Sequence, residues 1–135
     1  MVPVLIVALK DNDKMVRLRA VQAVRHFGSA GSAAIPQLIA TLKEPPGIGG
    51  PSAATGALVR IGAASVPALI DALKDENARI WAIAALGGLG KNSRASVPAL
   101  RALMADEDVG DKAAESIRTI ANEAEDVLPV LIDAL

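Results

Sequence analysis

The 135-residue sequence contains no cysteine and no tyrosine, and its only histidine and two aromatic residues are His26, Phe27 and Trp81. The absence of cysteine excludes disulfides and thiolate chemistry, and one histidine is too few for a zinc site built from His and Cys. No acidic residue is placed to orient His26 as a base toward Ser29 or Ser32. We therefore expect no catalytic residue, no metal site and no cofactor, and predict that the chain is not an enzyme.

Charge of one sign and long apolar runs are also scarce. The formal net charge is −1, which disfavours nucleic acid and anionic membranes as partners. No apolar run reaches the roughly 18–20 residues that a membrane span needs, so we expect no membrane association. Together with the lack of cysteine, these features favour a cytoplasmic protein.

The charge is divided unevenly along the chain. Residues 1–70 carry seven Lys/Arg and three Asp/Glu, a net charge of +4, whereas residues 71–135 carry seven and twelve, a net charge of −5. In an elongated molecule this division produces a charge dipole that could guide head-to-tail contact.

One phrase recurs five times, each time with proline in second place. Its copies are VPVLIVALKD from Val2, IPQLIATLKE from Ile35, VPALIDALKD from Val66, VPALRALMAD from Val97 and LPVLIDAL from Leu128. The prolines are spaced by 33, 31, 31 and 31 residues. Self-similarity at such a period is typical of stacked-repeat proteins. We predict a single domain, 1–135, with repeats at about 1–34, 35–65, 66–96 and 97–127 and a partial repeat at 128–135.

Each repeat is predicted to hold two helices. The first begins at the proline, which fits the first helical turn. The second follows another phrase, VRLRAVQAVRHFG at 16–28, ARIWAIAALGGLG at 78–90 and VGDKAAESIRTIA at 109–121. Its apolar residues form one wide helical stripe. Glycine is suited to ending such a helix, and Gly28, Gly62 and Gly90 stand at the expected ends.

Local departures from these phrases lead to further expectations. The stretch KEPPGIGGPSAATGAL predicts a longer turn in the second repeat and a second helix that begins near Ser52. Ser65 and Ser96 stand where a hydroxyl can help to cap the following helix. We expect Arg17 to pair with the acidic turn before its own helix.

The two phrases, in fixed order over nearly the whole chain, resemble the HEAT-repeat family, in particular its short variety found in the phycobilin lyase group. The resemblance implies an all-α fold, an α-solenoid (superhelix) of stacked antiparallel helix pairs. It also implies that the first helices line the convex surface and the second helices the concave one.

The free positions of the second helices are the candidate binding residues. Those we select are Arg19, Gln22 and His26 in the first repeat, Ile80, Trp81 and Ala84 in the third, and Lys112 and Glu115 in the fourth. Trp81 stands where the flanking repeats have Arg19 and Lys112, so a large aromatic anchor is predicted there. The alternative is that Trp81 fills space left by the small residues of the second repeat.

We predict a non-catalytic repeat scaffold that mediates protein–protein binding through its concave face. One alternative is a bilin-lyase-type accessory subunit that binds a tetrapyrrole. A second is a nucleic-acid-binding HEAT array, suggested by the basic first repeat and disfavoured by the acidic far end. Neither end carries a polar capping repeat, which predicts either a longer parent array or self-association through the uncapped ends. The partner's identity stays open.

Overall fold

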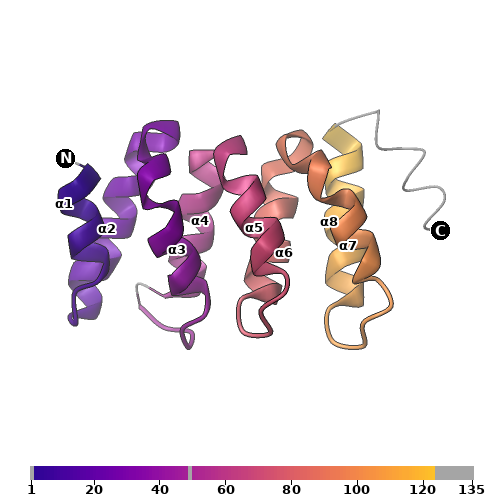
Figure 1. Ribbon diagram of the computed structural model, residues 1–135, viewed down its shortest axis with the longest axis horizontal. Helices are drawn as coiled ribbons and strands as arrows, with labels where there is room; N and C mark the ends of the chain where they lie inside the picture. The colour runs from indigo at the N-terminus through magenta and orange to yellow at the C-terminus, as the bar shows by residue number, and fades with distance from the viewer. Residues whose placement is uncertain (1, 49, 124–135) are drawn as a thin grey trace.

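A computed structural model describes residues 2–48 and 50–123, and these residues form α-helices joined by short turns and 3₁₀ segments (Figure 1). The α-helices are α1 (Val2–Leu9), α2 (Lys14–Phe27), α3 (Ile35–Leu42), α4 (Pro51–Ile61), α5 (Val66–Ala72), α6 (Arg79–Leu89), α7 (Val97–Ala102) and α8 (Gly110–Glu123). The 3₁₀ segments are η1 (Gly28–Ala34), η2 (Ala63–Ser65) and η3 (Gly90–Ser96). No β-strand occurs within the described residues.

The helices are arranged as a row of antiparallel pairs, α1–α2, α3–α4, α5–α6 and α7–α8 (Figure 1). Helices α2, α4, α6 and α8 contact one another in that order and form one layer, while α1, α3, α5 and α7 form the other. This confirms the predicted all-α stack of helix pairs. The superhelical twist and the repeat boundaries stay predictions, and the predicted partial repeat at 128–135 lies outside the described residues.

The core follows the repeated apolar positions. In the first helices, Leu38, Leu69 and Leu100 are fully buried at the same place in the phrase, and the second helices bury Val24, Leu58, Leu86 and Ile117 at theirs. Small residues at a second repeated place, Ala54, Ala82 and Ala113, are also fully buried and let neighbouring helices approach closely. Each large aliphatic side chain removed from water contributes roughly 1.5–3 kcal/mol, so neighbouring pairs stabilise one another.

Glycine ends three of the second helices, as predicted. Gly28, Gly62 and Gly90 have φ values of 55°, 93° and 57°, and within the described residues no other residue has a positive φ. The backbone N–H of Gly62 donates to the carbonyl of Leu58. Because side chains are strained in this region, glycine is the residue that lets the chain turn from the second helix into the next pair.

The expectation that Ser65 and Ser96 cap the following helix is wrong. Both lie in helical backbone where η2 and η3 run directly into α5 and α7, and neither hydroxyl caps an amide. Instead, the Ser65 hydroxyl donates to the carbonyl of Leu58 at 2.9 Å, and the Ser96 hydroxyl donates to that of Ser93 at 2.6 Å. The hydroxyls of the buried serines are therefore satisfied by backbone carbonyls that precede them in the chain.

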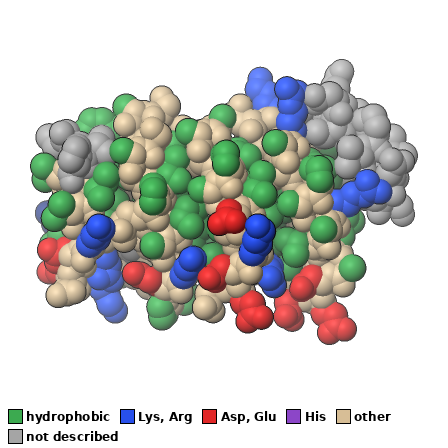
Figure 2. Space-filling model, viewed as in Figure 1, with side chains coloured by type: hydrophobic (Ala, Val, Ile, Leu, Met, Phe, Trp, Pro, Cys, Tyr) green, Lys and Arg blue, Asp and Glu red, His purple; other side chains and the backbone are tan. Residues whose placement is uncertain are grey.

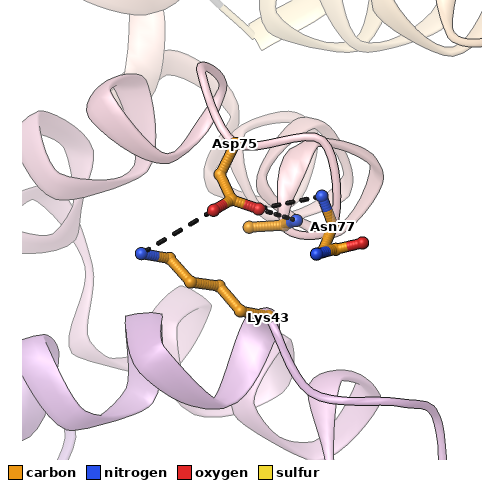
Figure 3. Close-up of polar contacts among 4 residues, drawn as sticks. Lys43, Asp75 and Asn77 are labelled. Atoms are coloured by element: carbon orange, nitrogen blue, oxygen red, sulfur yellow. Dashed lines mark hydrogen bonds and ion pairs between the residues drawn. The ribbon is translucent and has the colours of Figure 1, made fainter.

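The turns inside the pairs are held by aspartates. Asp75 accepts hydrogen bonds from the backbone N–H groups of Asn77 and Ala78 at 2.8 and 3.1 Å, and its other oxygen lies 3.8 Å from the ammonium of Lys43 (Figure 3). Asp106 accepts equivalent bonds from Asp108 and Val109. The Lys43–Asp75 contact joins the second pair to the third.

Arg17 pairs with the acidic turn before α2, as expected, and it does so through backbone carbonyls. The Arg17 guanidinium donates to the backbone carbonyls of Asp11 and Asn12 at 2.9 and 3.3 Å. In the third pair, Arg79 makes the same kind of bond, from Nε to the carbonyl of Leu73 at 2.8 Å. The arginine of the second phrase therefore satisfies carbonyls at the end of the first helix.

Two departures from the phrases have structural counterparts. Helix α3 ends at Leu42 and helix α4 begins at Pro51, which agrees with the predicted late start near Ser52. Gly110 replaces the arginine at the start of α8, and a Cβ atom placed there would lie 2.5 Å from the carbonyl oxygen of Met104. A side chain is therefore excluded by the backbone of the preceding turn.

Candidate functional site

The face formed by α2, α4, α6 and α8, called here the second-helix face, carries all the predicted binding residues. Trp81 is half-buried, and the others are exposed: Arg19, Gln22, His26, Ile80, Ala84, Lys112 and Glu115. Their exposure leaves them accessible to a partner, and what they bind stays a prediction.

A groove of about 460 Å³ lies between α6 and α8 on this face. We call it the α6–α8 groove, and its lining residues are Ile80, Trp81, Ile83, Ala84, Gly87, Gly88, Lys112, Glu115, Ser116 and Thr119. Five of the eight predicted residues are therefore brought together: Ile80, Trp81, Ala84, Lys112 and Glu115.

The floor of the groove is a close contact between the two helices. A Cβ atom placed on Gly87 would lie 2.7 Å from Oγ of Ser116, so α6 approaches α8 there without room for a side chain. The Ser116 hydroxyl donates to the backbone carbonyl of Ile83 at 3.0 Å and is buried. Because Gly88 is also without a side chain, the surface above this contact stays open.

The walls of the groove differ in chemistry. Ile80 and Trp81 on α6 provide apolar surface, and Ile80 is 44% exposed. Lys112, Glu115 and Thr119 on α8 provide an ammonium, a carboxylate and a hydroxyl. An apolar floor with a few polar groups at its edge can bind an apolar side chain and fix the orientation of the polar atoms beside it.

Trp81 packs against the core and also lines the groove. Part of its surface is buried and part lines the groove, so both expectations for this residue stay predictions. A rigid and partly buried aromatic anchor loses little conformational entropy when it binds.

The remaining predicted residues lie near the other end of the stack. Gln22 and His26 line a second hollow of about 400 Å³ together with Leu5, Ala23 and Phe27. Arg19 lines neither hollow. The eight predicted residues therefore do not form one continuous site.

The corresponding space between α2 and α4 is filled. Arg25 occupies the position in α2 that Gly87 has in α6, counted back from Gly28 and Gly90. Its guanidinium lies across α4, because a Cβ atom on Gly56 would be 3.5 Å from Cζ of Arg25. The long side chain covers the surface that glycine leaves open between α6 and α8.

Ile83, Gly87 and Ser116 were not among the predicted site residues. Ile83 and Ser116 belong to the stripe that packs between helices, and Gly87 was not selected among the free positions. Adjacent glycines at 87 and 88 and a serine at the small-residue position of α8 are the signal that could have indicated an open surface. No group of three or more His, Cys, Asp or Glu side chains in the described ranges is arranged to hold a metal ion.

Within the described residues, Asp106 has a carboxyl whose pKa is clearly shifted by its surroundings. Hydrogen bonds from the backbone N–H groups of Val109 and Asp108 lower the pKa of its carboxyl, and the nearby Arg79 charge adds to this effect. Asp106 lies in the turn before α8, so it helps to position the helix that carries Lys112 and Glu115.

Comparisons with known families agree with the geometry. The family model described as HEAT repeats matches residues 66–135, and the one described as PBS lyase HEAT-like repeat matches residues 51–75. The first match covers more than half of the chain. No curated protein matches the sequence. None of the helices in the described part of the chain has the length and apolar character required to cross a bilayer.

Proposed function

Because the chain belongs to the HEAT-repeat family, we propose that it is a non-catalytic scaffold that binds a protein partner through the second-helix face, with the α6–α8 groove as the anchoring point. HEAT repeats are scaffolds of a kind that typically binds proteins. In this proposal the second-helix face is the concave face of the solenoid, and the partner inserts an apolar side chain beside Trp81.

The observation that carries the proposal is the coincidence of Ile80, Trp81 and Lys112 in one open groove. Binding energy in protein interfaces concentrates in aromatic and apolar anchors that are surrounded by polar groups. The helix backbones below the groove are in tight contact, because Gly87 leaves no room beside Ser116. A floor of this kind is already shaped before the partner binds, which reduces the entropic cost of association.

The polar edge of the groove gives the partner its orientation. Lys112 and Glu115 are both exposed and lie on the same helix beside the apolar wall. Exposed charges of this kind affect specificity and association rate more than total affinity. We expect the preferred partner segment to place a carboxylate or backbone carbonyl near Lys112.

The proposal is tested by selecting short random peptides on the 135-residue chain. We expect the enriched peptides to share one large apolar residue. Trp81 is the only tryptophan and the chain has no tyrosine, so its fluorescence reports the groove directly. Titration of a selected peptide should shift the emission to shorter wavelength and saturate.

Variants locate the binding surface. Lys112→Glu should weaken peptide binding by about tenfold, whereas Lys10→Glu, an equal charge change on an exposed lysine away from the groove, should have little effect. Phe27→Ala serves as the aromatic control for Trp81→Ala. If the selected peptides bound Trp81→Ala and Lys112→Glu as tightly as the unchanged protein, the proposed face would be wrong.

The two other functions considered from the sequence give different readouts. A tetrapyrrole carrier would acquire a visible absorbance band after incubation with a bilin. A nucleic-acid-binding array would be retained on a DNA column and released as salt rises. We expect neither result, and either one would redirect the proposal away from a protein partner.

A further inference from the structure

The second helices of the first three pairs carry charge of one sign. Helices α2, α4 and α6 contain six Lys or Arg residues and no Asp or Glu. Arg17 and Arg79 are engaged with backbone carbonyls. Arg19, Arg25 and Arg60 are exposed, and within residues 2–48 and 50–123 none of the three forms an ion pair. We call these three residues the basic surface.

The opposite face of the stack has balanced charges. In Figure 2, which shows the side of α1, α3, α5 and α7, basic and acidic side chains lie beside one another along the lower half. Two of these neighbours are ion pairs, Lys43 with Asp75 at 3.8 Å and Lys74 with Asp71 at 3.4 Å. Guanidinium groups without a neighbouring carboxylate are therefore a property of the second-helix face.

The acidic turns are too far away to neutralise the basic surface. Asp13, which caps α2, precedes Arg25 by twelve residues, or about 18 Å along the helix axis. Charges in water are screened over about 8 Å at physiological ionic strength. Arg25 and Arg60 stand in the last turns of their helices, and the segments that follow, residues 28–36 and 62–67, contain no acidic residue.

The basic surface lies beside the α6–α8 groove. A Cβ atom on Gly56 would be 3.5 Å from Cζ of Arg25, so this guanidinium stands over α4, and Arg60 lies one helical turn further along α4. Helix α4 packs directly on α6, since a Cβ atom on Gly88 would be 3.1 Å from Cγ2 of Val59. Neighbouring helix axes are about 8–10 Å apart, so the groove lies roughly 12–15 Å from the axis of α4. An extended chain covers that span in about four residues.

We propose that the partner segment is acidic. An extended chain places Asp or Glu carboxylates on Arg25 and Arg60, while an apolar side chain about four residues away occupies the α6–α8 groove. This inference rests on the proposed function for the apolar contact and adds the chemistry of the partner. Because a guanidinium can donate two parallel hydrogen bonds to one carboxylate, the basic surface fixes the position of the segment along the stack.

A polypeptide suits this surface better than a nucleic acid, because the surface changes in character from α4 to α8. The groove beside the basic surface has an apolar wall of Ile80 and Trp81 and carries Glu115 on its other wall. A nucleic acid has a phosphate at every nucleotide, and Glu115 repels such a backbone. A peptide can place carboxylates on the arginines and an apolar side chain in the groove.

Two synthetic peptides, EEEEAFLAEEEE and QQQQAFLAQQQQ, test the inference. They share an apolar centre and differ in charge, and the flanks on both sides allow either chain direction. Isothermal titration calorimetry gives the dissociation constants, and the fluorescence of Trp81, the only tryptophan, reports occupation of the groove. We expect the acidic peptide to bind about five- to tenfold more tightly. This difference should shrink as salt rises, whereas binding of the glutamine peptide should change little.

Two double variants locate the contact. Arg25→Gln with Arg60→Gln should weaken binding of the acidic peptide to the level of the glutamine peptide. Lys10→Gln with Arg101→Gln is the matched control, because it removes two exposed positive charges outside the second-helix face, and it should leave the difference between the peptides unchanged. Circular dichroism establishes that each variant is folded, and the salt dependence tests the same contacts in the unchanged protein.

The outcomes separate this inference from the proposed function. Equal affinity of the two peptides, or equal losses in the two double variants, would overturn the acidic partner and leave the groove in place. So would tighter binding of single-stranded oligothymidylate than of the acidic peptide, because that result favours a nucleic acid. If the acidic peptide required Arg25 and Arg60 but bound Trp81→Ala unchanged, the acidic partner would be supported and the groove contradicted. Absence of any binding by the acidic peptide at low salt would overturn the inference.

Discussion

The α2–α4 interface and the α6–α8 interface have the same kind of buried packing but differ in their exposed surfaces. In both, a fully buried aliphatic residue of each helix, Val24 and Leu58 or Leu86 and Ile117, packs in the interior. On the second-helix face, Arg25 of α2 lies across Gly56 of α4. Between α6 and α8, glycine stands at the position of Arg25, and a groove remains open.

The packing between neighbouring second helices and the shape of their exposed surface are therefore determined by different positions of the second-helix phrase. The stripe of aliphatic and small residues sets the packing of neighbouring helices, and the free positions decide whether the surface above is filled or hollow. A repeat protein can therefore change its binding surface at one interface between helix pairs while the stack of pairs is retained.

Gly87→Ala should produce the largest change. The new methyl group would lie 2.7 Å from Oγ of Ser116 and 3.2 Å from its Cβ, so α6 and α8 must separate or the serine must lose its bond to Ile83. Overpacking typically costs 1–3 kcal/mol, partly offset by the better helix propensity of alanine. We expect a net loss of about 1–2 kcal/mol in the free energy of unfolding, measured by urea denaturation.

Gly88→Ala is the matched control for this substitution. Its methyl group would meet the Cγ2 atom of Val59 at 3.1 Å rather than a polar group held in a hydrogen bond. The mild crowding and the gain in helix propensity should nearly cancel. If Gly87→Ala were as stable as Gly88→Ala, the tight floor of the groove would be contradicted.

Asp75→Ala should have the next largest effect on the free energy of unfolding, because Asp75 holds the turn before α6 and also contacts the preceding helix pair. The substitution removes an acceptor for two backbone N–H groups and the contact with Lys43 (Figure 3). We expect a loss of about 1 kcal/mol, as for other capping aspartates. Asp71→Ala removes only an ion pair with Lys74, in which both side chains are about 80% exposed, and should change stability very little. Equal losses would show that the turn bonds do not stabilise the stack.

Much of the framework was predictable from the sequence, and the turns between pairs were not. Proline, the aliphatic stripe and the terminal glycines carry local signals, so the helices and their ends at Gly28, Gly62 and Gly90 were predicted. The roles of Ser65 and Ser96 depend on carbonyls that are brought near by burial. Capping preference alone therefore predicted the wrong partner.

The groove was predicted only in part for a similar reason. Helical periodicity identified Ile80, Trp81 and Lys112 as free positions. Whether they share one hollow depends on distances between α6 and α8, which Gly87 and Ser116 determine. The contact of Arg25 with Gly56 could not be predicted either, because the two residues belong to different repeats.

Gly56→Ala should have a smaller effect on the free energy of unfolding, and this substitution should stabilise the fold. A methyl group at Gly56 would meet the flexible end of Arg25 at an ordinary contact distance of 3.5 Å. The gain in helix propensity should then raise the free energy of unfolding by about 0.5–1 kcal/mol. A destabilised Gly56→Ala variant in urea denaturation would indicate that Arg25 is held rigidly against α4.

The smallest effect is expected for Asp106→Asn, measured as the thermal midpoint against pH. The folded protein lowers the pKa of Asp106 from its usual 3.8, so its charge stabilises the fold above that value and the contribution is lost as pH falls through the folded pKa. The variant should melt slightly below the unchanged protein at neutral pH and coincide with it in strong acid. A difference that persists in acid would contradict a charge-dependent contribution.

The most direct test of the proposed function is an NMR titration, in which changes in backbone amide chemical shifts are measured as a selected peptide is added to the 135-residue chain. We predict that the shifts concentrate on residues 80–88 of α6 and 112–119 of α8. Shifts confined to α1, α3, α5 and α7, or to the hollow beside Phe27, would contradict the claim that the open joint between α6 and α8 is where this scaffold binds its partner.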